Sequence, residues 1–219
     1  MKVNFEKTEC IWISANAGRA PCYLPVKWQT SDFFTLGIKF ISDEYNMSSN
    51  NFDGKFGSMQ DILNIWKMRD LSFIGKVLVV KSLGISKLVY SASTVPLFPD
   101  MIKKVQKEIN KFIWGSNIPK VKSDVMFQKP ENGGLKVTNF LIKVKSLLIT
   151  WVKRILKEDN ARWKHVIQEF FPGVSLIDLF RSRCCIGAIW TSIPLFYKQL
   201  LKHGMNSNHF STYYKYTNS

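Results

Sequence analysis

From Phe56 onward, apolar residues recur at steps of three and four, and this spacing limits the fold more than any other feature of the chain. A strand would alternate with a period of two, so the spacing predicts helices. The next segment, Trp66 to Leu83, surrounds aliphatic residues with Arg and Lys, and Ser72 is a good N-cap within it. The first apolar face consists of Phe56, Met59, Leu63 and Trp66.

The clearest helix is expected from Pro99 to Trp114. Proline suits the first helical position, Asp100 lies at the positive end of the helix dipole, and Gly115 can end the helix. Gly84 is expected to stop the preceding helix. Further helices are predicted at Ile85 to Ser93, Phe140 to Ile155, and Trp163 to Phe171.

Strand patterns are confined to the beginning of the chain. Thr8 to Ser14 reads as a strand, and Tyr23 to Trp28 with Phe33 to Phe40 is expected to form a hairpin around Thr30-Ser31-Asp32. The polar run Met47 to Asn51 predicts a break. The fold class is therefore α+β, mainly α. Its parts are a small antiparallel β region at 1–50, a helical bundle at 51–115, and a helical region at 116–219 with a poorly ordered tail from Asn206.

The formal charge of +15 and the isoelectric point of about 9.7 predict a polyanionic partner. Nucleic acid is the first candidate and an anionic membrane surface the second, while charge that serves solubility alone is the third. No stretch reaches the ~18 uncharged apolar residues of a membrane span, and Met1-Lys2-Val3-Asn4 lacks a signal core. We expect an intracellular protein, either nuclear or cytoplasmic, without membrane insertion. The irregularly spaced cysteines are expected to be reduced thiols: Cys10, Cys22, Cys184 and Cys185.

Several basic residues are candidates for binding a phosphate backbone. Lys104, Lys107 and Lys111 share a helix face, which is either a binding stripe or an ordinary solvated surface. Gly75 would let a sugar-phosphate backbone approach closely, or it would allow two helices to pack closely. The basic residues around it are Lys67, Arg69, Lys76 and Lys81.

Enzyme templates do not fit the chain. It contains no Asp-Asp pair for a two-metal site, and Asp43-Glu44 is expected to be a solvated turn. The cysteines and histidines Cys184, Cys185, His203 and His209 match no zinc spacing, and His165 lacks a nucleophile partner. We therefore predict no metal ligands among the residues of this chain. Among the tryptophans, the core residues are expected to be Trp66, Trp114 and Trp151.

A set of ordered motifs resembles the LINE-type (non-LTR) retrotransposon reverse transcriptases. The motifs are Val3-Asn4-Phe5-Glu6-Lys7-Thr8-Glu9, Thr35-Leu36-Gly37-Ile38, the run from Trp66 to Leu83, Phe112-Ile113-Trp114, Gly133-Gly134-Leu135 and Trp151-Val152-Lys153-Arg154. The resemblance covers roughly residues 2 to 160. It implies the end of a palm with a primer-grip hairpin at 1–50, a thumb at 51–115 and a post-thumb connection at 116–219.

The resemblance implies a fragment of an RNA-directed DNA polymerase, because the catalytic aspartates of the family would precede Met1. The full-length protein would use Mg²⁺, dNTPs, an RNA template and a DNA primer, whereas this chain alone would bind an RNA–DNA or DNA duplex without a cofactor. Lys7 is either a cation near departing pyrophosphate or a surface lysine, and we favour the latter. The alternative is a basic helical nucleic-acid-binding or interaction module, or a non-functional remnant. The implied contacts are Gly37, Arg69, Gly75, Lys76, Lys81, Lys104, Lys107 and Lys111.

Overall fold

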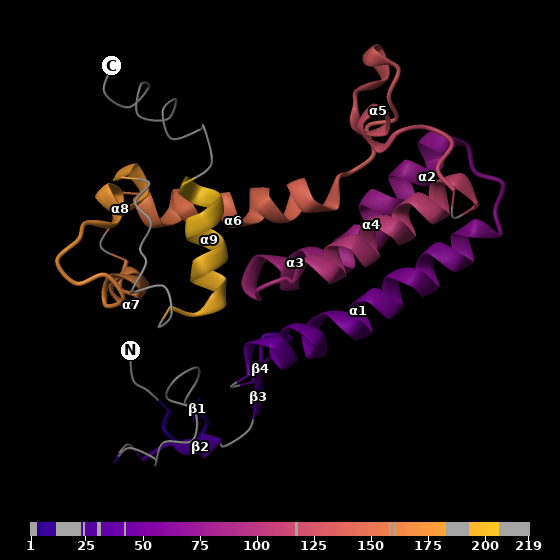
Figure 1. Cartoon of the computed structure of the whole chain (residues 1–219). Coiled ribbons are helices and arrows are strands. Elements are labelled where there is room, and N and C mark those ends of the chain that lie inside the picture. The colour runs from indigo at the N-terminus through magenta and orange to yellow at the C-terminus, as the bar shows by residue number, and fades with distance from the viewer. Residues whose placement is uncertain are drawn as a thin grey trace. The chain divides into compact units, whose positions relative to one another are not determined.

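The protein has an α+β, mainly α fold, as the sequence predicts (Figure 1). The computed structural model describes residues 4–11, 23, 25–29, 32–41, 43–116, 118–157, 159, 161–182 and 193–205. It divides into two compact units, Met1–Lys143 and Val144–Ser219. The predictions for Cys22, Cys184, Cys185, His209 and the tail from Asn206 lie outside the described residues.

Two short strand pairs open the first unit. β1 (Glu9–Ile11) pairs in parallel with β2 (Lys27–Gln29), whereas β3 (Asp32–Thr35) and β4 (Ile38–Ile41) form an antiparallel hairpin. The predicted pairing of Tyr23 to Trp28 with Phe33 to Phe40 is therefore wrong. The latter segment folds back on itself, because Leu36 and Gly37 both have positive φ, at 48° and 75°. Such a two-residue turn matches the twist of a hairpin.

The polar run Met47 to Asn51 is not a break, because it lies inside α1 (Glu44–Lys67). Asp43 caps this helix by accepting hydrogen bonds from the backbone amides of Tyr45 and Asn46. Asn51 is buried, and its side-chain oxygen accepts from the amide of Lys39 at 2.9 Å while its nitrogen donates to the Lys39 carbonyl at 2.7 Å. The polar side chains therefore attach the hairpin to the helix.

Gly84 does not stop a helix, contrary to the prediction. α2 (Phe73–Val79) continues through η2, a π-helix (Val80–Ile85), into α3 (Ser86–Thr94). An added Cβ at Gly84 would make ordinary van der Waals contacts with Leu63 and Met59, at 3.5 and 3.7 Å, so this position packs against α1 without requiring glycine. The predicted N-cap is confirmed, since the Ser72 hydroxyl accepts from the Gly75 amide at 3.2 Å.

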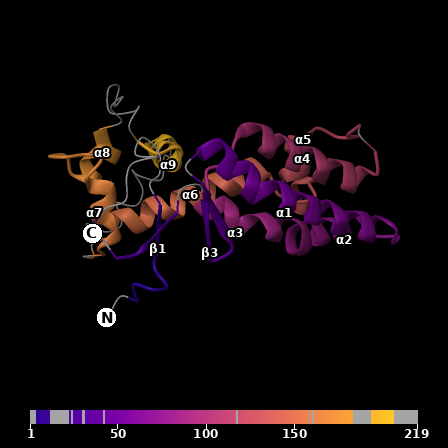
Figure 2. The ribbon, with the colours of Figure 1, turned by 90° about the horizontal axis from the view of Figure 1, so that it is seen from below.

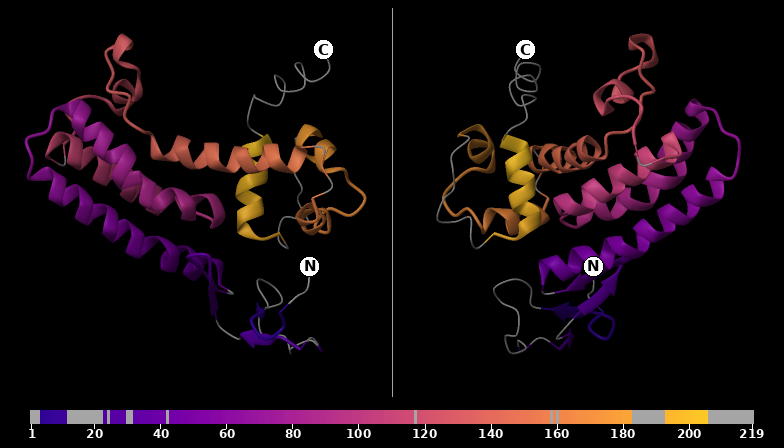
Figure 3. Two further views of the ribbon diagram at one scale, coloured as in Figure 1. Left: turned by 180° about the vertical axis from the view of Figure 1, so that it is seen from behind. Right: turned by 45° about the vertical axis from the view of Figure 1, so that its right-hand side comes forward.

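α4 (Pro99–Trp114) is the predicted helix, with Pro99 in its first turn and Gly115 in the left-handed conformation at its end. α1 contacts both α3 and α4, and α2 contacts α4, so the helices form a bundle (Figures 2 and 3). Hydrophobic burial holds the bundle together. Its core includes Phe52, Met59, Leu63, Val80, Leu88, Val105, Ile109 and Ile113.

A compact segment follows the bundle. It contains α5 (Ser123–Phe127) and a short 3-10 helix, η3 (Pro130–Asn132). The carbonyl of Met126 accepts hydrogen bonds from the amides of Leu135 and Val137, at 3.2 and 3.0 Å. These bonds tie the two ends of the segment together.

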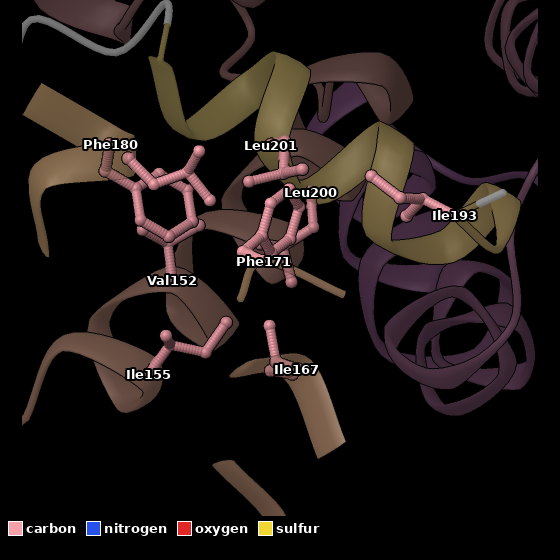
Figure 4. Packing of buried hydrophobic residues seen from close by; sticks show 9 residues of the cluster. Val152, Ile155, Ile167, Phe171, Phe180, Ile193, Leu200 and Leu201 are labelled. Atoms are coloured by element: carbon pink, nitrogen blue, oxygen red, sulfur yellow. The ribbon is translucent and has the colours of Figure 1, made fainter. Parts of the chain in front are cut away.

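The second unit contains most of α6 (Phe140–Leu156), followed by α7 (Trp163–Gln168), α8 (Leu176–Ser182) and α9 (Leu195–Met205). The sequence pattern predicts α6 and α7 but not α8 and α9. Gly204 fits closely in α9, since an added Cβ would lie 2.7 Å from the Phe180 ring. Figure 4 shows the core that these helices share, which consists of Val152, Ile155, Ile167, Phe171, Leu179, Phe180, Ile193, Leu200 and Leu201.

Within the described parts of the chain, no helix combines the length and the apolar character needed to cross a membrane.

Candidate nucleic-acid interface

The lysines of α4 form an exposed face of the bundle. Val105, Ile109, Phe112 and Ile113 anchor the opposite face in the core, so Lys104, Lys107 and Lys111 project into solvent. Their place on one face follows from helical spacing.

One carboxylate lies within this stripe. Glu108 lies 3.9 Å from the Lys111 ammonium and accepts a 3.2 Å hydrogen bond from Gln60. No ion pair involves Lys104 or Lys107 within the described residues. These two lysines therefore keep their ammonium groups available for an anionic ligand.

Arg69 is exposed in the turn between α1 and α2. Its guanidinium lies 4.6 Å from the centre of the Trp66 ring, a cation–π contact that restrains the side chain while leaving its N–H groups at the surface. A phosphate contact of Arg69 stays a prediction.

Lys76 has a partner that the sequence does not reveal. Its ammonium donates to the Ile113 carbonyl at 3.2 Å and lies 5.7 Å from the Phe73 ring. A cation at the carboxyl end of α4 is favoured by the helix dipole and by the unpaired carbonyls of the last turn. Lys76 thus links α2 to α4, and a phosphate would have to share its ammonium group.

The two glycines of the predicted site differ in their surroundings. An added Cβ at Gly75 would make only ordinary contacts with Ser72 and Leu71, at 3.5 and 3.7 Å, so no second helix packs closely there. Gly37 occupies the hairpin turn between β3 and β4. Its contact with nucleic acid stays a prediction.

The hairpin turn is attached to the bundle by two side chains that the sequence analysis missed. The Tyr90 hydroxyl donates to the Leu36 carbonyl at 2.8 Å, and the Lys55 ammonium donates to the Gly37 carbonyl at 3.4 Å and to the Ser91 hydroxyl. Burial lowers the pKa of Lys55. No local pattern around Tyr90 or Lys55 marks these contacts, because both depend on the packing of distant segments.

Lys81 lies on the π-helix, and burial together with the positive charge of Lys136 lowers its pKa. Lys81 is among the residues predicted from the sequence, whereas Lys136 is not. The signal for Lys136 is the preceding Gly133-Gly134 pair, which is typical of a tight turn that presents the next side chains.

Lys7 is exposed in a turn before β1, where its amide donates to the Asn4 carbonyl at 3.3 Å. The role of Lys7 stays a prediction. Asp43 is an N-cap, which gives the Asp43-Glu44 pair a structural role. The described residues contain no group of three or more His, Cys, Asp or Glu side chains placed to hold a metal ion.

Comparison with known proteins found a relative that is named as a ribonuclease H protein. No family model matches the sequence. It is similar to a protein of Arabidopsis thaliana that is named provisionally as a ribonuclease H protein, with 27% identity over 152 residues. The match covers 64% of this chain and 24% of the relative, so the chain spans only a minor part of the relative's length.

This similarity contradicts the resemblance to LINE-type reverse transcriptases. The relative is named for a different activity, and no comparison supports a reverse transcriptase. The interpretation as a polymerase fragment without its catalytic aspartates is therefore wrong, and the alternative of an interaction module or remnant gains no support from the relative. The physical reason lies in the motifs, since a basic amphipathic run such as Trp66 to Leu83 suits many helical bundles.

Proposed function

We propose that the chain binds nucleic acid through the exposed lysines of α4, with an RNA-containing duplex as its preferred ligand. The observation that carries the proposal is the pair Lys104 and Lys107, which are exposed on one face of a helix held rigidly by its buried side. Lysines on a rigid element contact phosphates without first ordering a loop, so little conformational entropy is lost on binding.

The overall charge and the named relative support the same ligand class. A formal charge of +15 attracts polyanions over long distances. The relative is named for a ribonuclease, which makes RNA the first ligand to test. Because the match covers only 24% of that relative, the proposal concerns binding and extends to no reaction.

The test measures binding of the full chain to a labelled RNA–DNA hybrid by fluorescence anisotropy at several salt concentrations. The variant Lys104→Ala/Lys107→Ala/Lys111→Ala should bind more weakly. The salt dependence of its log binding constant should fall by up to roughly 0.9 for each phosphate contact removed. Double-stranded DNA and double-stranded RNA serve as the competing ligands.

A matched control removes the same charge from the second unit. Lys153, Lys157 and Lys202 are exposed there, and their triple replacement by Ala should leave the salt slope nearly unchanged. Equal losses in the two triple variants would mean that net charge alone drives binding, which would contradict a site on α4. Tighter binding to double-stranded DNA would contradict the preference for RNA.

A further inference from the structure

The second unit exposes a tryptophan at the start of α7. The side chain of Trp163 is 39% exposed, although rings of this size are usually covered by other parts of a protein. Its ring meets the ring of Trp151 nearly at a right angle (81°), with 6.0 Å between the two ring centres. Trp151 packs in turn against the hydrophobic core of the second unit. The exposed indole is therefore supported by a ring that is itself anchored.

The turn that carries Trp163 is fastened by the next residue, Lys164. The Lys164 ammonium donates to the backbone carbonyls of Lys157 and Asp159, and it forms an ion pair with the Asp159 carboxylate at 2.7 Å. These contacts join the end of α6 to the first turn of α7. An indole on a restrained turn loses little conformational entropy when a flat ligand stacks on it.

Two arginines add positive charge to this surface. The Arg154 guanidinium lies 5.0 Å from the centre of the Trp151 ring, in a cation–π contact, and Arg162 directly precedes Trp163 in the sequence. Both side chains are exposed, and no ion pair among the described residues involves either of them. The Asp159 carboxylate is already paired with Lys164. The two guanidinium groups are therefore not neutralised by a described carboxylate.

We propose that Trp163, Arg154 and Arg162 bind unpaired nucleotides of a single-stranded nucleic acid. A base stacks on the Trp163 indole, and the guanidinium groups contact the neighbouring phosphates. Proteins that bind single strands without reading their sequence combine aromatic rings with positive charge in this way. A nucleotide carries both the flat ring that suits the indole and the negative charge that suits the arginines.

This site goes beyond the proposed contact of α4, because it lies in the other unit and takes a different form of nucleic acid. The bases of a duplex are stacked on one another and offer no free face to an indole. The triple replacement of Lys153, Lys157 and Lys202 leaves Trp163 and both arginines in place, so it remains a control for duplex binding.

The experiment measures binding of the full chain to a short labelled oligothymidylate by fluorescence anisotropy. An abasic oligomer of the same length keeps the sugars and phosphates and lacks the bases. Trp163→Leu keeps an apolar side chain and removes the ring, so it should weaken binding to oligothymidylate about tenfold. Its affinities for the abasic oligomer and for an RNA–DNA hybrid should stay unchanged. Trp163→Tyr keeps a ring and should retain most of the affinity for oligothymidylate.

A second variant tests the arginines. Arg154→Ala/Arg162→Ala should weaken binding to both oligomers, because the two oligomers share their phosphates. The salt slope should fall by up to roughly 0.7 for each phosphate contact that is removed from a single strand. Phe34→Ala is the matched control, since Phe34 is an aromatic residue of β3 that is 70% exposed. This change should leave the affinity for oligothymidylate unchanged.

Equal affinities of Trp163→Leu, Trp163→Tyr and the unmodified chain for oligothymidylate would overturn the site, because the indole would then serve packing alone. An equal loss of affinity for the abasic oligomer in Trp163→Leu would also overturn it, since no base would be involved. The duplex measurements report separately on α4, so either result would leave the proposed function in place.

Discussion

The left-handed backbone of Lys136 opposes stability. With a φ of 53°, this residue is in a conformation that glycine adopts without steric cost. We expect Lys136→Gly to raise the free energy of unfolding by up to about 1 kcal/mol. Urea unfolding measures the effect.

Lys129→Gly is the matched control, because Lys129 is exposed and has an ordinary φ of −69°. This change should lower the unfolding free energy by about 0.5–1 kcal/mol, since glycine loses more backbone entropy on folding. Equal changes in the free energy of unfolding for the two variants would show that the backbone strain at Lys136 does not affect stability.

Single residues were predictable from the sequence where their role is local. Ser72, Pro99 and Gly115 act within one helical turn of their own position, so residue type and spacing suffice to place them. The partner of Lys76 was not predictable, because the Ile113 carbonyl lies on another helix.

At the scale of elements, Asn51 decides how the β3–β4 hairpin is attached to α1. Replacing Asn51 by Ala leaves the amide and the carbonyl of Lys39 without their side-chain partner. We expect a loss of about 2–3 kcal/mol in the free energy of unfolding, because unpaired buried polar groups are costly. Thermal unfolding measures this loss, and hydrogen exchange at the Lys39 amide should accelerate.

Asn50→Ala is the control for this prediction. Asn50 is exposed and donates to the Asn46 carbonyl within the same helix, at 2.8 Å. Its replacement should change stability by no more than about 0.5 kcal/mol. A comparable loss in both variants would assign the effect to helix propensity and not to hairpin attachment.

Elements were predictable where apolar spacing is regular. α4 and α6 have continuous apolar stripes, and both helices lie close to the predicted ranges. The start of α1 was missed because its inward side chains include Ser48 and Asn51, which look like a break in a hydrophobicity pattern. Gly84 was misread because the helix continues through it and packs there against Leu63 and Met59 of α1.

At the scale of the whole molecule, the two units should respond differently to acid. Burial, followed by the charges of Lys145 and Lys202, lowers the pKa of His203 below its ordinary value of 6.5. The unfolded chain therefore binds a proton more readily than the folded chain, and stability falls as the pH drops through 6.5 toward the folded pKa. We expect the Tm to decrease between pH 7.5 and 5, with His203→Gln reducing the decrease.

The dependence of stability on pH is expected in the second unit, because His203 lies there. Domain-resolved hydrogen exchange should show the acid-induced opening in Val144–Ser219 before Met1–Lys143. Identical pH profiles for the His203→Gln variant and the unmodified chain would contradict the assignment to this imidazole.

The fold class followed from the sequence, whereas the family did not. Helical spacing and positive charge indicate a basic helical bundle. Many protein families share this architecture, so these two properties do not identify the family. The ordered short motifs added little information, because each consists of residues that also suit a turn or a helix face. The comparison with the Arabidopsis protein, at 27% identity, contradicts the family interpretation, whereas the fold class is confirmed by the structure.

The π-helix at Val80–Ile85 has a consequence for how related chains vary in length. A π-helical turn accommodates one residue more than an α-helical turn, which is why a single insertion into an α-helix is absorbed as such a bulge. A homologue that lacks one residue in this stretch would form a continuous α-helix with α3 facing the same way. A chain one residue shorter at this point would therefore lack the bulge, while the rest of the bundle could keep its packing.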